Sequence, residues 1–240
     1  GRRRGGGGGG YKNIVLAPWS VQETYDLIQL AFHLADQYRN PVVFLSDGLL
    51  GQMVEMLEVK TLDFGPLPPK DWCVRGRNHQ ADGVRRGVIW GQGFIPTPQF
   101  PTYLSFIEHF AEKIQRMKEA EVRYETYYVE DADLLLVAYG SSARISLEAV
   151  EMARAQGIRA GLVRPITLWP FPYEAIRKLA EKTTLFLAVE DSQGQMVDDV
   201  ESAVAERAQV NFLGMLARHE PTEMGMLFAE RVLEEIKRVL

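Results

Sequence analysis

Four short polar stretches of the sequence carry the residue types that bind small molecules. Each follows an apolar run typical of a buried strand, and ligands of open parallel sheets bind beyond the carboxyl ends of the strands. The candidate ligand-binding or subunit-interface residues in these stretches are Asp47, Gly48, Gly140, Ser141, Ser142, Arg164, Thr167, Glu190, Gln193 and Gln195. We expect any binding chemistry of this chain at these positions.

Two of these stretches could hold an anion. Gly140, Ser141 and Ser142 lead into an expected helix, whose free N–H groups and dipole attract negative charge. A plain turn with an N-cap is the favoured alternative there. Arg164 could clamp a carboxylate or a phosphate with its two-pronged guanidinium group. An ion pair between Arg164 and Glu190 is an equally good interpretation, and it would make the arginine structural.

The remaining residues do not predict a reaction. Asp47 and Glu190 are single carboxylates far apart in the sequence, so their spacing does not indicate an acid–base pair. The chain has four histidines without metal-like spacing and a single cysteine, Cys73. One cysteine excludes an iron–sulfur cluster held by this chain alone. We therefore assign no catalytic residue, no metal ligand and no cofactor-binding residue from the residues themselves.

Composition narrows the class of protein. The 240 residues carry a net charge of −5, and the dense basic cluster Arg2-Arg3-Arg4 stands alone at the start, so we expect no binding to nucleic acid. No apolar run has the length that a bilayer requires, and we expect a cytoplasmic protein. The opening GRRRGGGGGG has its glycines before a strand instead of after one, which favours a flexible loop over a nucleotide-binding loop.

The first part of the chain reads as one strand–helix–strand unit. Apolar runs over 14–17 and 41–45 flank a helical pattern that begins after Ser20, with Glu23 completing a capping box. Such a unit pairs its strands in parallel, but two strands and one helix cannot cover both faces of a sheet. We expect the end of a domain whose front half is absent, with a sheet that is incomplete or completed by another chain.

The rest of the chain predicts a linker and a complete domain. Residues 59–130 are rich in proline and glycine, with one long amphipathic helix from 103 to about 124. From 131 to 240, apolar runs at 134–138, 160–163, 185–189 and 210–213 alternate with helical patterns, which is typical of a parallel-sheet α/β sandwich. The predicted units are therefore 1–58, 59–130 and 131–240.

Longer strings of the sequence resemble a known family. VAYGSSARIS (137–146), GLVRPITLWPFP (161–172) and VEDSQGQMVDDV (189–200) are similar to the second domain of the α subunit of 2-oxoacid:ferredoxin oxidoreductases. YKNIVLAPWSVQETYDL (11–27) and PVVFLSDGLLGQM (41–53) resemble the last part of that subunit's first domain, and EVRYETY (121–127) the approach to the second. The resemblance is greatest to members acting on 2-oxoisovalerate or 2-oxoglutarate.

That resemblance implies a fold and an activity. The fold is a transketolase C-terminal-like domain preceded by the C-terminal part of a thiamine diphosphate pyrimidine-binding domain. The activity is oxidative decarboxylation of a 2-oxo acid to an acyl-coenzyme A, with the electrons passed to ferredoxin. The β subunit would hold thiamine diphosphate, Mg²⁺ and the iron–sulfur cluster, and γ or δ subunits could join the complex.

The sequence also departs from the family. The early Y-P-I-T-P-like motif and the acidic residue that contacts the pyrimidine are not in this chain, and residues 73–99 match poorly. We therefore expect the polypeptide to be inactive alone. Two alternatives stay open, namely a non-catalytic assembly module and a component of a transketolase or a lipoamide-dependent 2-oxoacid dehydrogenase.

Overall fold

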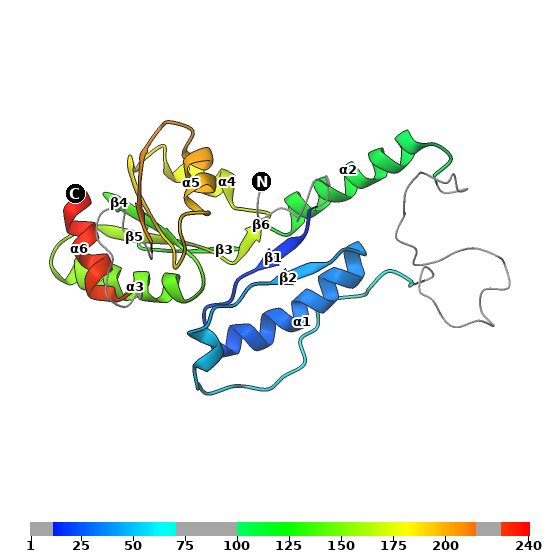
Figure 1. The fold of residues 1–240 in the computed structure, drawn as a ribbon, viewed down its shortest axis with the longest axis horizontal. Helices are drawn as coiled ribbons and strands as arrows, with labels where there is room; N and C mark the ends of the chain where they lie inside the picture. Colours follow the sequence, from blue (N-terminus) through cyan, green and yellow to red (C-terminus); the bar gives the residue numbers. More distant parts are fainter. Residues whose placement is uncertain (1–11, 71–99, 215–226) are drawn as a thin grey trace.

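The protein contains two β-sheets that lie side by side. The structure, a computed structural model, describes residues 12–70, 100–214 and 227–240. One sheet has three strands in the order β2-β1-β6, and the other has five in the order β3-β5-β4-β7-β8. Figure 1 shows the two sheets with their helices and the helix α2 (Tyr103–Ala120) projecting from the junction between them. The glycine-rich opening and Cys73 lie outside the described residues.

The N-terminal unit, residues 12–70, is the expected strand–helix–strand unit. β1 (Ile14–Leu16) and β2 (Val42–Phe44) pair in parallel, and α1 (Val21–Tyr38) connects them. The Ser20 side chain caps α1 by accepting the N–H of Glu23, which confirms the expected helix start. A short 3₁₀ turn, η1 (Leu50–Gln52), follows β2.

The third strand of this sheet comes from much later in the chain. β6 (Thr167–Trp169) pairs with β1 in antiparallel orientation, with Val15 opposite Trp169. The sequence analysis predicted no strand there, because a strand of three residues leaves too short a pattern to detect. The expected incomplete sheet is thus extended by a strand of the same chain, and no strand among the described residues pairs with the outer edge of β2.

The C-terminal unit, residues 124–214 and 227–240, contains the expected α/β sandwich. Its central strands pair in parallel, and helices cover both faces. One face packs against α3 and α6, and the other against α4 and α5. The elements are β4 (Leu134–Ala138), α3 (Gly140–Ala155), β5 (Ala160–Pro165), α4 (Tyr173–Leu179), β7 (Leu185–Val189), α5 (Val197–Val204), β8 (Gln209–Leu213) and α6 (Ala229–Val239).

Between the two units, the structure differs from the sequence-based expectation. The long helix ends at Ala120 instead of about residue 124, and β3 (Tyr124–Tyr127) follows it. The helix ends where Glu121 turns inward, because its buried carboxylate accepts hydrogen bonds from Tyr38 and Arg123. β3 then joins the edge of the large sheet, antiparallel to β5. The sequence analysis missed this strand, because the helical pattern of the sequence continues beyond Ala120.

An extended segment, residues 53–64, lies along α1. Two glutamines of α1 hold its main chain: the amide of Gln22 exchanges two hydrogen bonds with Glu58, and the amide of Gln29 bonds Lys60 and Leu62. Some side chains of this segment face away, since Val54 is 97% exposed and Met56 is 95% exposed. The segment therefore contacts α1 through its backbone and through a few side chains, among them Glu55, whose carboxylate accepts the N–H of Val21 at 2.9 Å.

Candidate functional site

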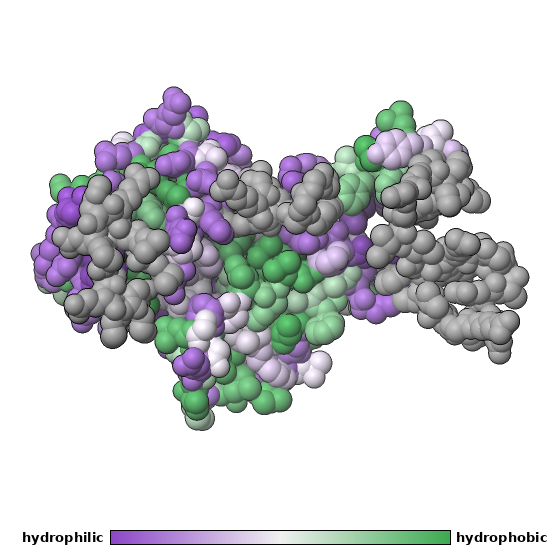
Figure 2. Space-filling view, viewed as in Figure 1, coloured by the Kyte–Doolittle hydropathy of each residue, from purple (hydrophilic) through white to green (hydrophobic). Residues whose placement is uncertain are grey.

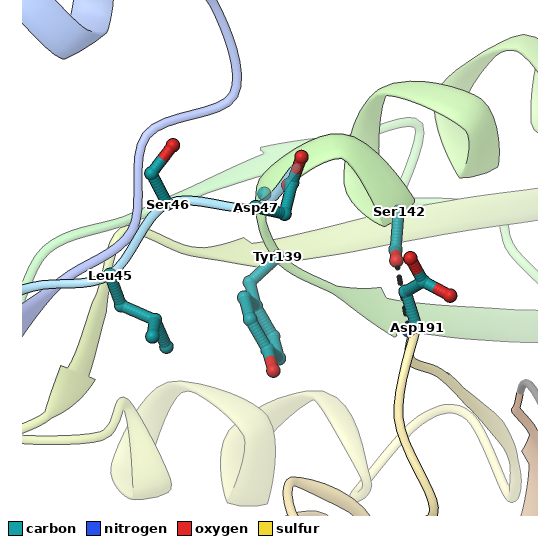
Figure 3. A pocket seen from close by; sticks show the side chains of 7 residues that line it. Leu45, Ser46, Asp47, Tyr139, Ser142 and Asp191 are labelled. Carbon is teal, nitrogen blue, oxygen red and sulfur yellow. Dashed lines mark hydrogen bonds between the residues drawn. The ribbon is translucent and has the colours of Figure 1, made fainter. Parts of the chain in front are cut away.

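A pocket lies at the junction of the two units, where the carboxyl ends of β2, β4 and β7 meet. Its volume is about 180 Å³. The residues that line it come from both units (Figure 3): Leu45, Ser46, Asp47, Tyr139, Gly140, Ser142 and Asp191. The structure thus brings together three of the candidate residues, Asp47, Gly140 and Ser142, and adds Asp191, which the sequence analysis missed.

Asp47 ties the N-terminal unit to the first turn of α3. One of its carboxylate oxygens accepts the N–H of Ser141 at 3.0 Å, and the other accepts the N–H of Leu50 at 2.8 Å. The side chain that caps α3 therefore comes from Asp47 and not from Tyr139, the residue at the N-cap position. The expected anion-attracting helix start exists, and a carboxylate of the same chain occupies it.

Gly140 is required by this contact. It has a φ of +58°, a conformation that favours glycine, and a Cβ at this position would lie 3.1 Å from the Asp47 carboxylate. The structure also places Gly140–Ser142 in the first turn of α3, where the sequence predicted a turn before a helix beginning at about 145. The close approach of Asp47, 94 residues away in sequence, explains the difference.

The pocket is acidic. Asp191 lies opposite Asp47, and its N–H donates to the Ser142 hydroxyl at 3.1 Å. Burial, and then the charge of Asp47, raise the pKa of Asp191 above its ordinary value. Two carboxylates around one small cavity attract positively charged groups and disfavour phosphate. In sequence, the position of Asp191 two residues after a strand end was the signal that could have found it.

Glu190 stabilises its own loop. Its side chain is fully buried and accepts backbone N–H groups from Gln195, Met196 and Val197, at 2.8 to 3.2 Å. It also accepts the hydroxyl of Ser192 at 3.1 Å. These bonds satisfy the free donors before and at the start of α5. Glu190 thus caps the start of α5, with the Gln195 N–H among its donors, and the side chains of Gln193 and Gln195 are exposed.

Arg164 does not pair with Glu190, and that interpretation is corrected here. The arginine is fully buried on β5, where it bonds Glu23 of α1 and, at 2.7 Å, Glu125 of β3. The centre of its guanidinium group lies 3.9 Å from the centroid of the Trp19 ring. Its partners are 141 and 39 residues away in sequence, so no local pattern predicts them.

Neither of the other two candidates, Thr167 and Gly48, lines the pocket. The Thr167 hydroxyl is buried, accepts the N–H of Arg123 at 2.8 Å and donates to the Arg123 carbonyl at 3.2 Å. Gly48 lies in the loop after β2 and has open space where a Cβ would be. Thr167 therefore joins β6 to the chain before β3, whereas Gly48 contributes to the turn at the pocket edge.

Two family models match this chain in succession. The model of the pyruvate flavodoxin/ferredoxin oxidoreductase, thiamine diphosphate-binding domain matches residues 4–126, and that of the pyruvate:ferredoxin oxidoreductase core domain II matches residues 132–224. The first of these alone spans half of the chain. The chain is therefore a member of the pyruvate flavodoxin/ferredoxin oxidoreductase family.

Individual relatives agree with this membership. The ketoisovalerate oxidoreductase subunit VorB of Methanothermobacter marburgensis is 48% identical over 200 residues, covering 83% of this chain and 54% of the relative. The 2-oxoglutarate synthase subunit KorA of the same organism is 32% identical over 234 residues, covering 89% and 62%. The chain therefore spans about half the length of the curated relatives it matches.

A solved structure shares the fold. A chain of the 2-oxoglutarate:ferredoxin oxidoreductase from Magnetococcus marinus, with 2-oxoglutarate, coenzyme A and succinyl-CoA bound, superposes with a TM-score of 0.64. The match covers 97% of this chain and 43% of that chain, at 18% sequence identity. Nearly all of the present chain thus follows the architecture of that protein.

The residues described here do not fit the diphosphate of the family's cofactor. The pocket is lined by two carboxylates and by no positively charged side chain. No group of three or more histidine, cysteine, aspartate or glutamate side chains in the described part of the chain is arranged to hold a metal ion. We therefore derive no reaction step through thiamine diphosphate from these residues.

None of the described helices has the length and apolarity that crossing a bilayer requires.

Proposed function

We propose that this chain belongs to the α subunit of a 2-oxoacid:ferredoxin oxidoreductase. The assembled enzyme would convert a 2-oxo acid and coenzyme A into an acyl-coenzyme A and carbon dioxide. The two electrons released would reduce two ferredoxins, and one proton would go to water. In this proposal, the chain contributes to the thiamine-binding domain, to core domain II and to the junction between them.

The observation that carries the proposal is the 48% identity over 200 residues to a ketoisovalerate oxidoreductase subunit. The identity to the 2-oxoglutarate synthase subunit is lower, at 32%. A branched-chain 2-oxo acid is therefore the proposed substrate, and 2-oxoglutarate is the competitor to test against it. Both relatives are subunits, which supports action within a complex.

The proposed complex divides the cofactors between chains. A β subunit would hold the thiamine diphosphate with its Mg²⁺ and the iron–sulfur cluster, while γ or δ subunits and ferredoxin would complete the electron path. The acidic pocket and the single cysteine support this division, because this chain offers little to a diphosphate or a cluster. Coenzyme A is the proposed co-substrate, and the cytoplasm is the proposed location.

The test is turnover by the reconstituted complex. The α chain that contains this sequence is expressed together with its partner subunits, and 2-oxo acid-dependent reduction of ferredoxin is followed with coenzyme A present. We expect 3-methyl-2-oxobutanoate to give a higher kcat/KM than 2-oxoglutarate or pyruvate. A complex without the α chain is the control. Turnover that requires lipoamide in place of ferredoxin would contradict the proposal.

A second candidate is an assembly module without catalytic function. The exposed apolar side chains of the extended segment, Val54 and Met56, favour it, because such surfaces mark contacts between proteins. The same reconstitution separates the two candidates. A complex that forms with this chain but turns over equally well without it would identify the assembly module.

A further inference from the structure

One buried charge lies between the two units of the protein. Arg164 projects from β5 of the large sheet and has no exposed surface. Its partners divide into two groups: Glu125 belongs to the neighbouring strand β3, whereas Glu23 and Trp19 belong to the N-terminal unit. The arginine therefore contacts both units at once.

The partner in its own sheet orients the arginine. Glu125 lies directly opposite Arg164 in the antiparallel pairing of β3 with β5. Glu125 also accepts the hydroxyl of Tyr127 at 2.8 Å. Burial, followed by this hydrogen bond to Glu125, raises the pKa of Tyr127 to about 12, so the hydroxyl keeps its proton and remains a donor. One oxygen of Glu125, Oε2, thus accepts hydrogen bonds from both Tyr127 and Arg164.

Two residues of the N-terminal unit, Glu23 and Trp19, bind the guanidinium group of Arg164. The Glu23 carboxylate accepts a hydrogen bond from one guanidinium nitrogen of Arg164. It also accepts a hydrogen bond from the N–H of Trp19 at 2.8 Å. The guanidinium carbon of Arg164 lies over the Trp19 ring, which gives a cation–π contact. Burial is the main cause that raises the pKa of Glu23, and the charge of Glu125 raises it further, while Arg164 lowers it. Without the arginine, two carboxylates would face each other here.

These contacts reach the pocket through β1 and β2. Trp19 follows β1 closely, and the Leu45 N–H, just after β2, donates to the Leu16 carbonyl of β1 at 2.8 Å. Asp47 comes two residues later and bonds Ser141 across the junction. A shift of Trp19 and Glu23 relative to β5 would therefore move the wall of the pocket that carries Asp47.

We infer that Arg164 is a positioning residue: by bridging Glu23 and Glu125, it fixes the N-terminal unit against the large sheet and keeps the pocket between them in shape. A lysine cannot replace it, because only the planar fork of arginine reaches two carboxylates and stacks on a ring at the same time. One nitrogen, Nε, has no hydrogen-bond partner among the described residues, so the side-chain hydrogen bonds described for Arg164 go to the two carboxylates.

Hydrogen exchange of the full chain tests this inference without substrate, so its outcome does not depend on the proposed function. Two amides report the junction, since Ala17 donates to the Ile166 carbonyl and Ser141 to Asp47. Leu136, at the centre of the large sheet, reports global opening. The variants are Arg164→Met, Arg164→Lys and Glu23→Gln. Arg159→Met, which breaks the exposed pair with Asp133 within the C-terminal unit, is the matched control.

We expect exchange at Ala17 and Ser141 to rise about tenfold or more relative to Leu136 in Arg164→Met, because the junction then opens without global unfolding. Arg164→Lys and Glu23→Gln should raise the same ratio less, and Arg159→Met should leave it unchanged. Arg164→Met risks general destabilisation, so the two milder variants decide. The inference is overturned if the ratio keeps its wild-type value in both of them.

Discussion

The two units of the protein bury their strands to different extents. In the C-terminal unit, β4 lies between β5 and β7, and all five of its residues are fully buried. In the N-terminal unit, β1 is equally well covered, but its neighbour β2 is an outer strand with Val43 39% exposed. Apolar side chains gather on the surface where β1 and β2 lie (Figure 2).

This difference shows where each unit obtains its stability. The large sheet has helices on both faces and a core that its own residues fill. The small sheet depends on elements from elsewhere in the chain, since β6 supplies its third strand and Met117 of α2 packs into its core. The N-terminal unit is therefore the part whose stability rests on its neighbours, and the Arg164 bridge is one such support.

The largest expected effect comes from the core of the C-terminal unit. Leu136→Ala in β4 removes a fully buried side chain, and we expect a loss of about 3 kcal/mol in the free energy of unfolding, since a cavity forms in a packed core. Val43→Ala in β2 should lower the free energy of unfolding by only about 0.5 to 1 kcal/mol, because Val43 is 39% exposed and buries less apolar surface. Urea denaturation of the two variants measures the contrast, and equal costs would contradict it.

A smaller effect is expected from Glu190, which stabilises the same unit through hydrogen bonds. In Glu190→Gln, an amide replaces a charged acceptor that receives several N–H groups, and we expect a loss of about 1 to 2 kcal/mol. The urea midpoint measures this cost, and exchange should rise locally at Met196 and Val197. Glu206→Gln, at an exposed glutamate beyond α5, is the control. If Glu190→Gln changes neither the urea midpoint nor the exchange at Met196 and Val197, Glu190 does not stabilise the start of α5.

At the junction, Asp47→Asn should break one of the two backbone hydrogen bonds that Asp47 accepts, because an amide has a single acceptor oxygen, and it should change a titration. The lost hydrogen bond is worth about 1 kcal/mol. The variant also removes the charge that helps to raise the pKa of Asp191, so that pKa should fall towards its ordinary value, although burial still raises it. NMR titration of the Asp191 carboxyl group measures the shift, with Asp198→Asn as the control.

The sign of the pH effect follows from the same shift. The folded chain holds the proton on Asp191 to a higher pH than the unfolded chain does, so this group lowers the free energy of unfolding as pH rises from the unfolded to the folded pKa. In Asp47→Asn that decline should be smaller. A decline that is unchanged or steeper would show that Asp47 does not act on Asp191.

The smallest effect is expected at the surface of the C-terminal unit. Arg159 and Asp133 form an exposed ion pair, with side chains 58% and 49% exposed. Water screens such pairs, so Arg159→Ala should leave the urea midpoint unchanged. A clear loss of stability there would mean that surface charges contribute more to this unit than its core arrangement suggests.

The sequence predicted the elements whose pattern is local. The strands over 14–17, 134–138 and 185–189 are continuous apolar runs, and the structure confirms them with ends that differ by at most a residue. β3 and β6 escaped detection, because β3 has four residues without a continuous apolar run and follows a helix closely, and β6 has only three residues. Short strands are fixed by their partners and not by their own sequence.

The candidate site divides in the same way. Asp47, Gly140 and Ser142 were found because strand ends in parallel sheets converge. The bridge from Arg164 to Glu23 was not, because 141 residues separate the two and the pairing depends on how the units pack. The convergence of strand ends predicted where the pocket lies, whereas the contacts that hold its two sides together could be identified only in the three-dimensional structure.

The two glutamines of α1 recognise a segment by its main chain. Gln22 and Gln29 bond the N–H and carbonyl groups of residues 58–62, which every amino acid except proline offers alike. Substitutions at the exposed side chains of Val54, Met56 and Val59 can therefore change the surface that this segment presents without breaking its hydrogen bonds to α1. Proline at Glu58 or Leu62 is the exception, because it removes the bonded N–H.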